Sequence, residues 1–458
     1  MTSAARGWAR WEAPGLAATL LVALALRLNN YAAAPLPTDN QDELDWTWSG
    51  LGIITRGVPY GWSNLRAYTD HVAVTANGTT FAVTHPFLDH PPLFSLLVGL
   101  VAWLQGARAL GDVTVAMVRP VPIALGVFSL LLLYVLGRDL MGAPAAMAGT
   151  IALATAPAAV LVQRQVEAES LIAPLMLLGM LALYRRISGD ARRRWIVVLL
   201  ATCALAPLAK VSGIAVAGAA VAVLLGSGHW RLALAAAGAG LVGLGAFFLY
   251  GIAYNADLFF RVISESESRR YGVMGLYQFI AASSGPSGSV RHMRDGWWLL
   301  GWLGAGALLG RDRDTRRELV LWALAAYAVV IMLAAEGIQD YGWFRVAVYP
   351  LVYLLAGRLA WVAVSQPSAL ALLAVLTLGG ATATSALFGS GGTGWAPSAF
   401  LLLGALAVAV TPAVVAGWRA ESKTARNVAR GFAAAALVFV VGCNIATAIH
   451  LDTLYFVL

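Results

Sequence analysis

The sequence is poor in charged residues. Asp, Glu, Lys and Arg make up 12% of its 458 residues, hydrophobic residues make up 60%, and the mean hydropathy is +0.74. Soluble domains are roughly a quarter charged, so this composition excludes a soluble globule. Apolar runs recur along the chain without a long polar block. The composition therefore predicts an all-α polytopic membrane protein with a single integral-membrane domain, residues 1–458.

Cysteines and nucleotide-binding motifs are also scarce. The two cysteines, Cys203 and Cys443, each lie inside an apolar run, which supports neither a disulfide framework nor a cysteine metal cluster. The sequence contains no GxxxxGK[ST] loop, no strand-turn-helix pattern and no polar domain that could hold a nucleotide sugar. Any group donor is therefore expected to come from the bilayer.

The basic residues are concentrated in three loops. The formal charge of +8 would suggest a nucleic-acid partner in a soluble protein. The loops at 185–194, 311–318 and 419–430 hold thirteen Lys and Arg residues against five acidic ones. Cytoplasmic loops of membrane proteins carry such an excess, so we place these loops inside and expect no nucleic-acid partner.

The apolar stretches between these loops predict about thirteen transmembrane helices of about 20 residues each, with the C-terminus outside. The chain is therefore expected to be a multi-pass plasma (inner) membrane protein. Residues 195–226 are too many for one span, and Pro207, Lys210 and Gly213 interrupt them, so we expect two helices that meet outside. The expected spans are 14–30, 120–137, 143–162, 170–184, the two within 195–226, 232–250, 296–310, 319–335, 343–361, 368–388, 397–418 and 432–450.

Residues 92–105 (PLFSLLVGLVAWLQ) are apolar but short for a span. Either they form an interfacial helix on the outer side, or one of the later topology anchors is wrong. Their length and the preceding proline favour the interfacial helix. Within the single domain, 14–361 is expected to be the functional module, with outer loops at 31–118 and 252–295, and 362–458 to add C-terminal transmembrane helices.

Acidic residues gather after the first expected span. Residues 36–61 carry Asp39, Asp42, Glu43 and Asp45, although the whole chain has only 23 acidic residues. A carboxylate at the membrane edge, with its pKa raised by its neighbours, could take a proton from an attacking hydroxyl. A solvated loop is the alternative, because acidic residues are common outside.

Two histidines follow in the segment HPFLDHPPLF. His85, Asp89 and His90 could ligate zinc or manganese, and Asp89 and His90 are candidates for substrate contact. The prolines alone make a good start for a helix, so a stiff helix entry is the alternative to a metal site.

Four basic residues lie at inferred outer helix ends: Arg119, Arg164, Lys210 and Arg345. Together they would suit a phosphate, which arginine binds as a fork and lysine as a point charge. Each alone could equally extend toward lipid headgroups. Glu169, five residues after Arg164, could pair with that arginine or contact a sugar hydroxyl.

The long outer segment 255–295 contains LFFRVISESESRRYG, in which alternating Ser and Glu precede Arg270 and Tyr271. This pattern fits a polar lid over a cavity and fits a solvated loop equally well. The outer loop EGIQDYG adds Tyr341 as a further candidate for substrate contact.

The order of six short motifs resembles the GT-C glycosyltransferases of the dolichyl-phosphate-mannose protein mannosyltransferase type, which include the aminoarabinose transferases. The resemblance covers roughly residues 15 to 360, and Glu169 stands where the family usually has Asp. The motifs are QDELDWTWSGLGIITRGVPY (41–60), DHPPLF (89–94), RPVPIALGVFSLLLLYVLGRDLMG (119–142), PAAVLVQRQVEAESLI (157–172), LAPLAKVSG (205–213) and RVAVYPLVYLLAG (345–357).

The resemblance implies a GT-C fold with about thirteen transmembrane helices and juxtamembrane helices in the first outer loop. It also implies inverting transfer of a sugar from a polyprenyl-phosphate donor to a hydroxyl of a glycan, lipid or protein on the extracytoplasmic face. Asp42 would be the base and Glu43 would position a substrate. Arg119, Lys210 and Arg345 would stabilise the leaving phosphate. Some relatives bind a divalent metal, so the cofactor stays open.

Two other classes of protein are compatible with parts of the sequence. A transporter or flippase for a lipid-linked or anionic substrate would want repeated halves and charges on both sides of the midplane, whereas the charges here collect on one side. An acyl- or phosphotransferase would need an essential Ser or His nucleophile, for which His90 is the candidate.

Overall fold

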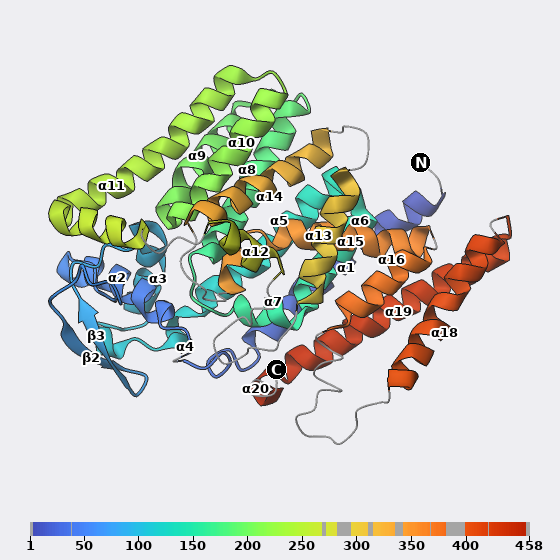
Figure 1. Cartoon of the computed structure of the whole chain (residues 1–458), viewed down its shortest axis with the longest axis horizontal. Coiled ribbons are helices and arrows are strands. Elements are labelled where there is room, and N and C mark those ends of the chain that lie inside the picture. The colour runs from blue at the N-terminus through green and yellow to red at the C-terminus, as the bar shows by residue number, and fades with distance from the viewer. Residues whose placement is uncertain are drawn as a thin grey trace.

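The computed structural model describes residues 3–37, 39–267, 272–281, 295–309, 315–334, 342–366, 368–381, 399–419 and 421–454. Helices dominate this part of the chain (Figure 1), as the composition predicts. The helices of the bundle are α1 (Ser3–Leu28), α5 (Pro120–Met141), α6 (Ala143–Thr155), α7 (Pro157–Val162), α8 (Glu169–Ile187), α9 (Arg193–Ala209), α10 (Ile214–Gly226), α11 (Trp230–Glu267), α13 (Gly296–Leu309), α14 (Thr315–Ala334), α15 (Tyr349–Ser365), α18 (Ala399–Trp418) and α19 (Lys423–Ile449).

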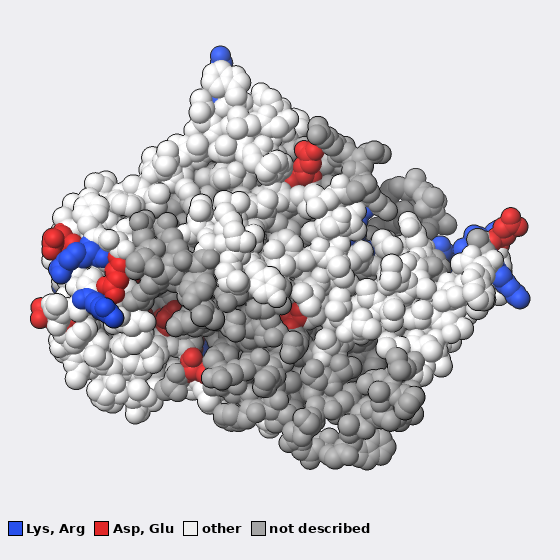
Figure 2. Space-filling model, in the orientation of Figure 1, with Lys and Arg blue, Asp and Glu red and all other residues white. Residues whose placement is uncertain are grey.

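Five stretches of helix among the described residues are long and apolar enough to cross a membrane. On the face seen in Figure 2, Lys and Arg side chains stand near the edges, and the described surface between them is mostly uncharged apart from a few acidic side chains. This distribution is typical of a protein that presents apolar side chains to lipid. The five stretches are Trp11–Leu28, Val115–Met141, Glu169–Ile187, Trp230–Ser266 and Lys423–Ile449, and the expected count of about thirteen spans stays a prediction.

The stretch 195–226 forms two helices, as expected. Lys210 ends α9 with extended backbone angles (φ −159°, ψ 147°), and a 3₁₀ turn, η2 (Val211–Gly213), leads into α10. Pro207 lies in the last turn of α9. The break therefore presents Lys210 at a junction of helices, where its backbone leaves the helical path.

Helical structure extends into two segments that were expected to be loops. Helix α11 bends at Asn255 (φ −166°, ψ 100°) and continues to Glu267, because the Asn255 side-chain oxygen accepts a hydrogen bond from Leu258 N at 3.0 Å and caps the new segment. Helix α19 begins at Lys423 rather than near residue 432, since Ser422 Oγ accepts from Ala425 N at 3.2 Å. Short polar caps thus extended both helices beyond the apolar runs.

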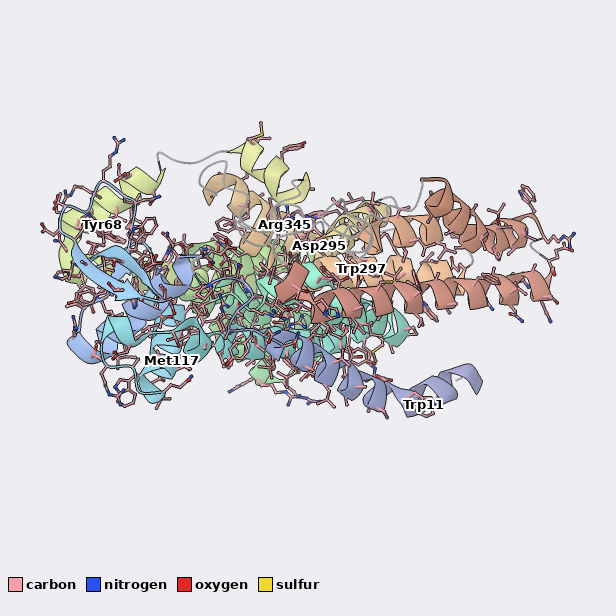
Figure 3. All side chains as sticks on the ribbon, turned by 90° about the horizontal axis from the view of Figure 1, so that it is seen from below. Trp11, Tyr68, Met117, Asp295, Trp297 and Arg345 are labelled. Carbon is pink, nitrogen blue, oxygen red and sulfur yellow. The ribbon has the colours of Figure 1, made fainter. Side chains whose placement is uncertain are left out.

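Residues 31–118 fold into three α-helices, a 3₁₀ turn and a small antiparallel sheet of order β1 (Gly61–Trp62), β3 (Thr79–Thr84), β2 (Val72–Ala76) at one end of the molecule, with α18 and α19 at the other end (Figure 3). The hairpin of β2 and β3 was not predicted, although Asn77 and Gly78 have the positive φ angles (49° and 77°) of a two-residue hairpin turn. The elements are α2 (Asp42–Arg56), β1 (Gly61–Trp62), β2 (Val72–Ala76), β3 (Thr79–Thr84), α3 (Pro92–Leu104), η1 (Leu110–Asp112) and α4 (Val115–Val118).

Helix α3 has 13 residues and is about 20 Å long at 1.5 Å per residue, which is shorter than a hydrocarbon core of about 30 Å. It packs against α2 through glycines. A β-carbon at Gly99 would lie 2.3 Å from Leu51 N, and one at Gly50 would overlap Ser95 O. The two backbones therefore touch, and this contact fixes the direction of α2. The interfacial placement of α3 stays a prediction.

We expect Gly99→Ala to lower the free energy of unfolding by about 1–3 kcal/mol or more, because the new methyl group must push two backbones apart. Gly245→Ala is the matched control, since a β-carbon at that position in α11 meets nothing within 4 Å. Thermal melting of the detergent-solubilised variants, followed by tryptophan fluorescence, measures the difference. Equal melting of both variants would contradict the close approach of α2 and α3.

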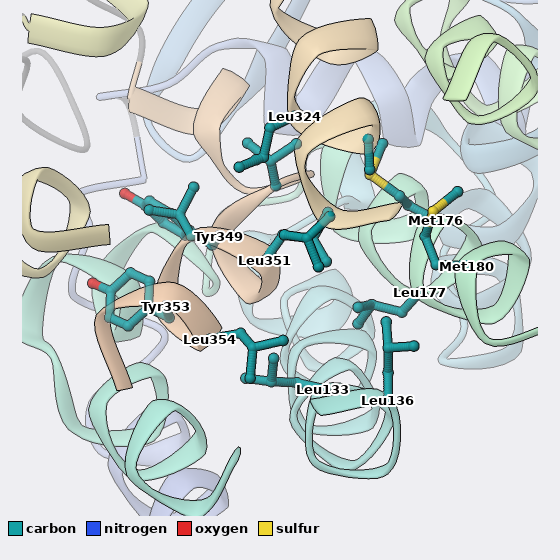
Figure 4. Packing of buried hydrophobic residues seen from close by; sticks show 14 of the residues in the cluster. Leu133, Leu136, Met176, Leu177, Met180, Leu324, Tyr349, Leu351, Tyr353 and Leu354 are labelled. Atoms are coloured by element: carbon teal, nitrogen blue, oxygen red, sulfur yellow. The ribbon is translucent and has the colours of Figure 1, made fainter. Parts of the chain in front are cut away.

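The largest hydrophobic cluster lies around α15. Figure 4 shows Leu351 and Leu354 of this helix facing side chains of α5, α8 and α14. Helix α15 is buried along almost its whole length. The segment before it, η3 (Gly342–Arg345), is thereby held against the bundle. The remaining described elements are α12 (Val273–Ala281), α16 (Ala369–Ala374), the π-helical η4 (Val375–Gly379) and α20 (Leu451–Leu454).

Candidate active site

Helix α2 begins at Asp42, so Asp42 and Glu43 open a separate helix rather than ending the first span. The Asn40 side-chain oxygen accepts a hydrogen bond from Asp42 N at 3.1 Å. Asp42, Glu43 and Asp45 occupy the first turn, where the helix dipole favours acidic side chains. The first turn of α2 therefore carries three carboxylates, which project from different sides of the helix.

Glu43 points inward and forms a buried ion pair with Arg119. Arg119 Nε and Nη2 donate to the two Glu43 oxygens at 2.9 and 2.7 Å, and both side chains have no exposed area. Val166 N adds a third hydrogen bond to this carboxylate at 3.1 Å. Arg119 Nη1 donates to the carbonyls of Tyr31 and Pro35. The guanidinium is thus engaged at all three nitrogens, which favours a structural clamp over phosphate binding.

Arg164 is also buried and serves the backbone of the first helix. Its Nη1 and Nη2 donate to Ala34 O at 2.9 Å and to Leu26 O at 2.7 Å. Glu169 does not pair with it. Instead, Lys210 Nζ donates to Glu169 Oε1 at 2.7 Å. Of the two roles considered for Glu169, the ion pair with Arg164 is therefore not formed.

Lys210 lies beside aromatic rings as well as carboxylates. Its ammonium is 4.7 Å from the centre of the Phe344 ring and 5.8 Å from that of Trp46. An ammonium has three hydrogens to donate, and the ion pair with Glu169 uses one of them. The position at the α9–α10 break thus holds a cation that can bind a second anion.

Asp42 lies next to Lys210 and is half-buried. None of the described residues donates a hydrogen bond to its carboxylate in the structure, in contrast to Glu43. Burial raises the pKa of Asp42. The Lys210 ammonium opposes this rise, and the Glu169 and Glu43 carboxylates add to it. A carboxylate with a raised pKa and no side-chain partner is suited to accept a proton.

His90 and Asp89 lie beside this cluster, because His90 packs on the Trp46 ring that Lys210 also approaches. The His90 ring stacks on Trp46 with centroids 4.3 Å apart, and burial lowers the pKa of His90 to about 3, so the imidazole is neutral. Asp89 accepts hydrogen bonds from Ser63 Oγ and the Tyr68 hydroxyl, which ties it to the outer loop. Among the described residues, no group of three or more His, Cys, Asp and Glu side chains is placed to hold a metal ion.

Arg345 is the last residue of η3, and its side chain contacts α12 and α13. Its Nε donates to Phe279 O at 3.1 Å, and its guanidinium lies 5.1 Å from the centre of the Trp298 ring. Figure 3 shows it beside Asp295. Phe344, the preceding residue, faces Lys210, so one short turn links the two cations. Arg270, Tyr271 and Tyr341 lie outside the described residues.

Several buried polar residues were not singled out from the sequence. Arg27 donates to Gln163 and to the carbonyls that end α6, and Asp295 accepts hydrogen bonds from the Tyr353 hydroxyl. Glu167 binds Asn40. The signal for Arg27 was a charge within an apolar run, LLVALALRL. Asn40 and Glu167 carried no local signal, because their pairing joins residues far apart in the chain.

A helical bundle whose first two long helices are joined by a segment of short helices and a small sheet defines the class: this is the GT-C fold. Residues 89–253 match the family of dolichyl-phosphate-mannose-protein mannosyltransferases. The fold predicted from the motif resemblance is therefore confirmed.

Solved structures with this fold are ArnT from Cupriavidus metallidurans and the arabinosyltransferase EmbB from Mycobacterium smegmatis. For ArnT bound to undecaprenyl phosphate, the TM-score is 0.57 at 17% identity, over 98% of this chain and 78% of ArnT. For apo ArnT these values are 0.59, 18%, 99% and 78%. EmbB gives 0.57 at 16% identity, over 95% of this chain and 41% of EmbB. No curated protein matches the sequence.

Proposed function

We propose that the protein is a membrane glycosyltransferase that transfers a sugar, with inversion, from a polyprenyl-phosphate donor to an acceptor hydroxyl on the extracytoplasmic face. The polyprenyl phosphate bound to ArnT supports this class of donor. The basic loops, which the positive-inside rule places in the cytoplasm, support the outer position of α2. The chemistry of the cluster around Asp42 supports the reaction.

The observation that carries the proposal is that a carboxylate without a hydrogen-bond donor among the described residues, Asp42, lies next to an ammonium, Lys210, that is held by another carboxylate. Asp42 has a raised pKa and no hydrogen bond from a described side chain, whereas Lys210 is anchored to Glu169. In the proposed step, Asp42 takes the proton of the acceptor hydroxyl and the hydroxyl oxygen forms a bond to the anomeric carbon. The bond from that carbon to the phosphate oxygen breaks, and polyprenyl phosphate leaves with the electron pair.

Lys210 and Arg345 are proposed to bind the leaving phosphate. Cations that are already in position to stabilise the negative charge that develops in the transition state are a large source of rate enhancement in a water-poor site. Phe344 contacts the Lys210 ammonium while Arg345 is the next residue, which supports a shared site. Arg119 and Arg164, predicted from the sequence as phosphate or substrate ligands, are better explained as buried supports because glutamate or carbonyl oxygens occupy them.

Glu169 and His90 are proposed to contact the sugars. Glu169 Oε1 is bound by Lys210, but its Oε2 is buried without a hydrogen-bond partner. A buried carboxylate oxygen left unpaired is costly, and a sugar hydroxyl would supply the missing donor. The neutral imidazole of His90 has one donor and one acceptor, as a hydroxyl needs. The transferred sugar is proposed to be a hexose or a pentose.

Incubation of the purified protein with defined polyprenyl-phosphate sugars and candidate acceptors tests the proposal. The expected result is free polyprenyl phosphate in an amount equal to the glycosylated product, whose anomeric configuration is opposite to that of the donor. Movement of intact donor between leaflets of a vesicle, without release of polyprenyl phosphate from any donor tried, would instead support a flippase.

A further inference from the structure

We infer that Glu167 is a positioning residue that holds the first turn of α2, and with it the Asp42 carboxylate, in the geometry for reaction. The inference deepens the proposed function and rests on it. Glu167 lies in the connection between α7 and α8 and has no exposed area. It is therefore placed to act through other residues rather than to touch solvent or a lipid headgroup.

Both Glu167 carboxylate oxygens are bound by residues of the α2 region. Asn40 Nδ2 donates to Oε1 at 2.6 Å, and Trp46 Nε1 donates to Oε2 at 3.3 Å. Asn40 is 3% exposed and Trp46 is fully buried. Hydrogen bonds to a buried charged group are among the stronger ones, so the two contacts fix the helix to the α7–α8 connection.

The two partners of Glu167 bracket Asp42. Asn40 Oδ1 accepts from Asp42 N at 3.1 Å, so the same amide side chain links Glu167 to the backbone of the proposed base. Trp46 is four residues after Asp42 and so lies on the same face of the helix one turn later. Val166, the neighbour of Glu167, donates its N–H to Glu43. The α7–α8 connection therefore forms hydrogen bonds with Asn40, Glu43 and Trp46, which lie before, in and just after the first turn of α2.

Glu167 and Asp42 are also close enough to interact electrostatically. Burial raises the pKa of Glu167, and the Asp42 carboxylate raises it further. The titratable and charged groups that interact with Asp42 are Glu43 and Asp45 of α2, Glu167, Glu169 at the start of α8 and Lys210 at the end of α9.

Two substitutions test the geometry. Glu167→Gln leaves one acceptor oxygen for two donors. Glu167→Asp keeps both carboxyl oxygens but is one methylene shorter, so it cannot reach Asn40 and Trp46 together. We expect kcat to fall about 10-fold to 100-fold in both variants, as for a displaced catalytic group, with the donor KM unchanged.

Amide hydrogen exchange of residues 42–46 supplies a readout that does not depend on turnover. Faster exchange together with lower kcat in both variants supports the inference. Faster exchange with unchanged kcat overturns it, since Glu167 would then stabilise the helix only. Lower kcat with unchanged exchange also overturns it, because Glu167 would then contact substrate. Asp139→Asn, which removes a carboxylate paired with Arg185, is the control.

This design separates the two proposals. If Asp42→Asn is fully active, the assignment of the base fails, and the hydrogen exchange of the Glu167 variants still decides whether Glu167 fixes the first turn of α2. If Asp42→Asn is inactive while both Glu167 variants keep full kcat, the base stands and the positioning role is overturned.

Discussion

Replacing Asp42 by asparagine is expected to leave the protein folded and to lower kcat by about 10²-fold to 10⁴-fold, the usual contribution of a general base. Asparagine has nearly the same size and cannot take the proton of the acceptor. The Asp42 carboxylate accepts no hydrogen bond from a described residue, so the loss of charge should cost little stability. Release of polyprenyl phosphate from a defined donor measures the effect.

Asp39→Asn is the matched control, because Asp39 precedes α2 by three residues and has no assigned role in the reaction. Its variant should keep turnover within about twofold of the unsubstituted protein, because Asp39 lies outside the cluster of Asp42, Glu169 and Lys210. Full activity of Asp42→Asn would refute the assignment of the base.

The pH dependence gives a second check on Asp42. A base acts in its deprotonated form, and burial raises the pKa of Asp42. The rate should therefore fall as the pH drops through a value above the ordinary aspartate pKa of about 4. This acid limb should be missing from the residual activity of Asp42→Asn.

Replacing Lys210 by methionine is expected to lower kcat by about 10²-fold to 10³-fold, the effect of removing one donor that stabilises developing negative charge. It also leaves the Glu169 carboxylate buried without its partner, which should lower the free energy of unfolding by about 3–5 kcal/mol. Turnover and thermal melting of the same preparation measure both effects.

The double variant Lys210→Met with Glu169→Gln separates the two roles of Lys210. Neutral glutamine removes the uncompensated charge, so melting should return toward that of the unsubstituted protein while turnover stays low. Recovery of turnover together with stability would mean that Lys210 serves only as the partner of Glu169 and that the leaving phosphate depends on other groups.

The sequence predicted much of the bundle because apolar runs and their interruptions act locally. Pro207 and Gly213 marked the break at Lys210, and the length of 92–105 marked α3 as a short helix. The sequence did not predict the ends of α11 and α19, where the side chains of Asn255 and Ser422 cap the helices. It also did not predict the hairpin at Asn77 and Gly78, because a two-residue turn is a weak signal beside long apolar runs.

Composition and motif order are enough to assign the class of protein and to identify its notable charges, because long apolar runs require a membrane and residues such as Asp42, Lys210 and Arg119 are scarce beside them. How these charges pair follows from the packing of the helices. Arg119 is engaged by Glu43, Lys210 by Glu169, and Asp42 by no described side chain. Ion pairs join residues 41 to 76 positions apart, and which carboxylate meets which cation depends on the crossing of helices. Local pattern carries no information about that crossing.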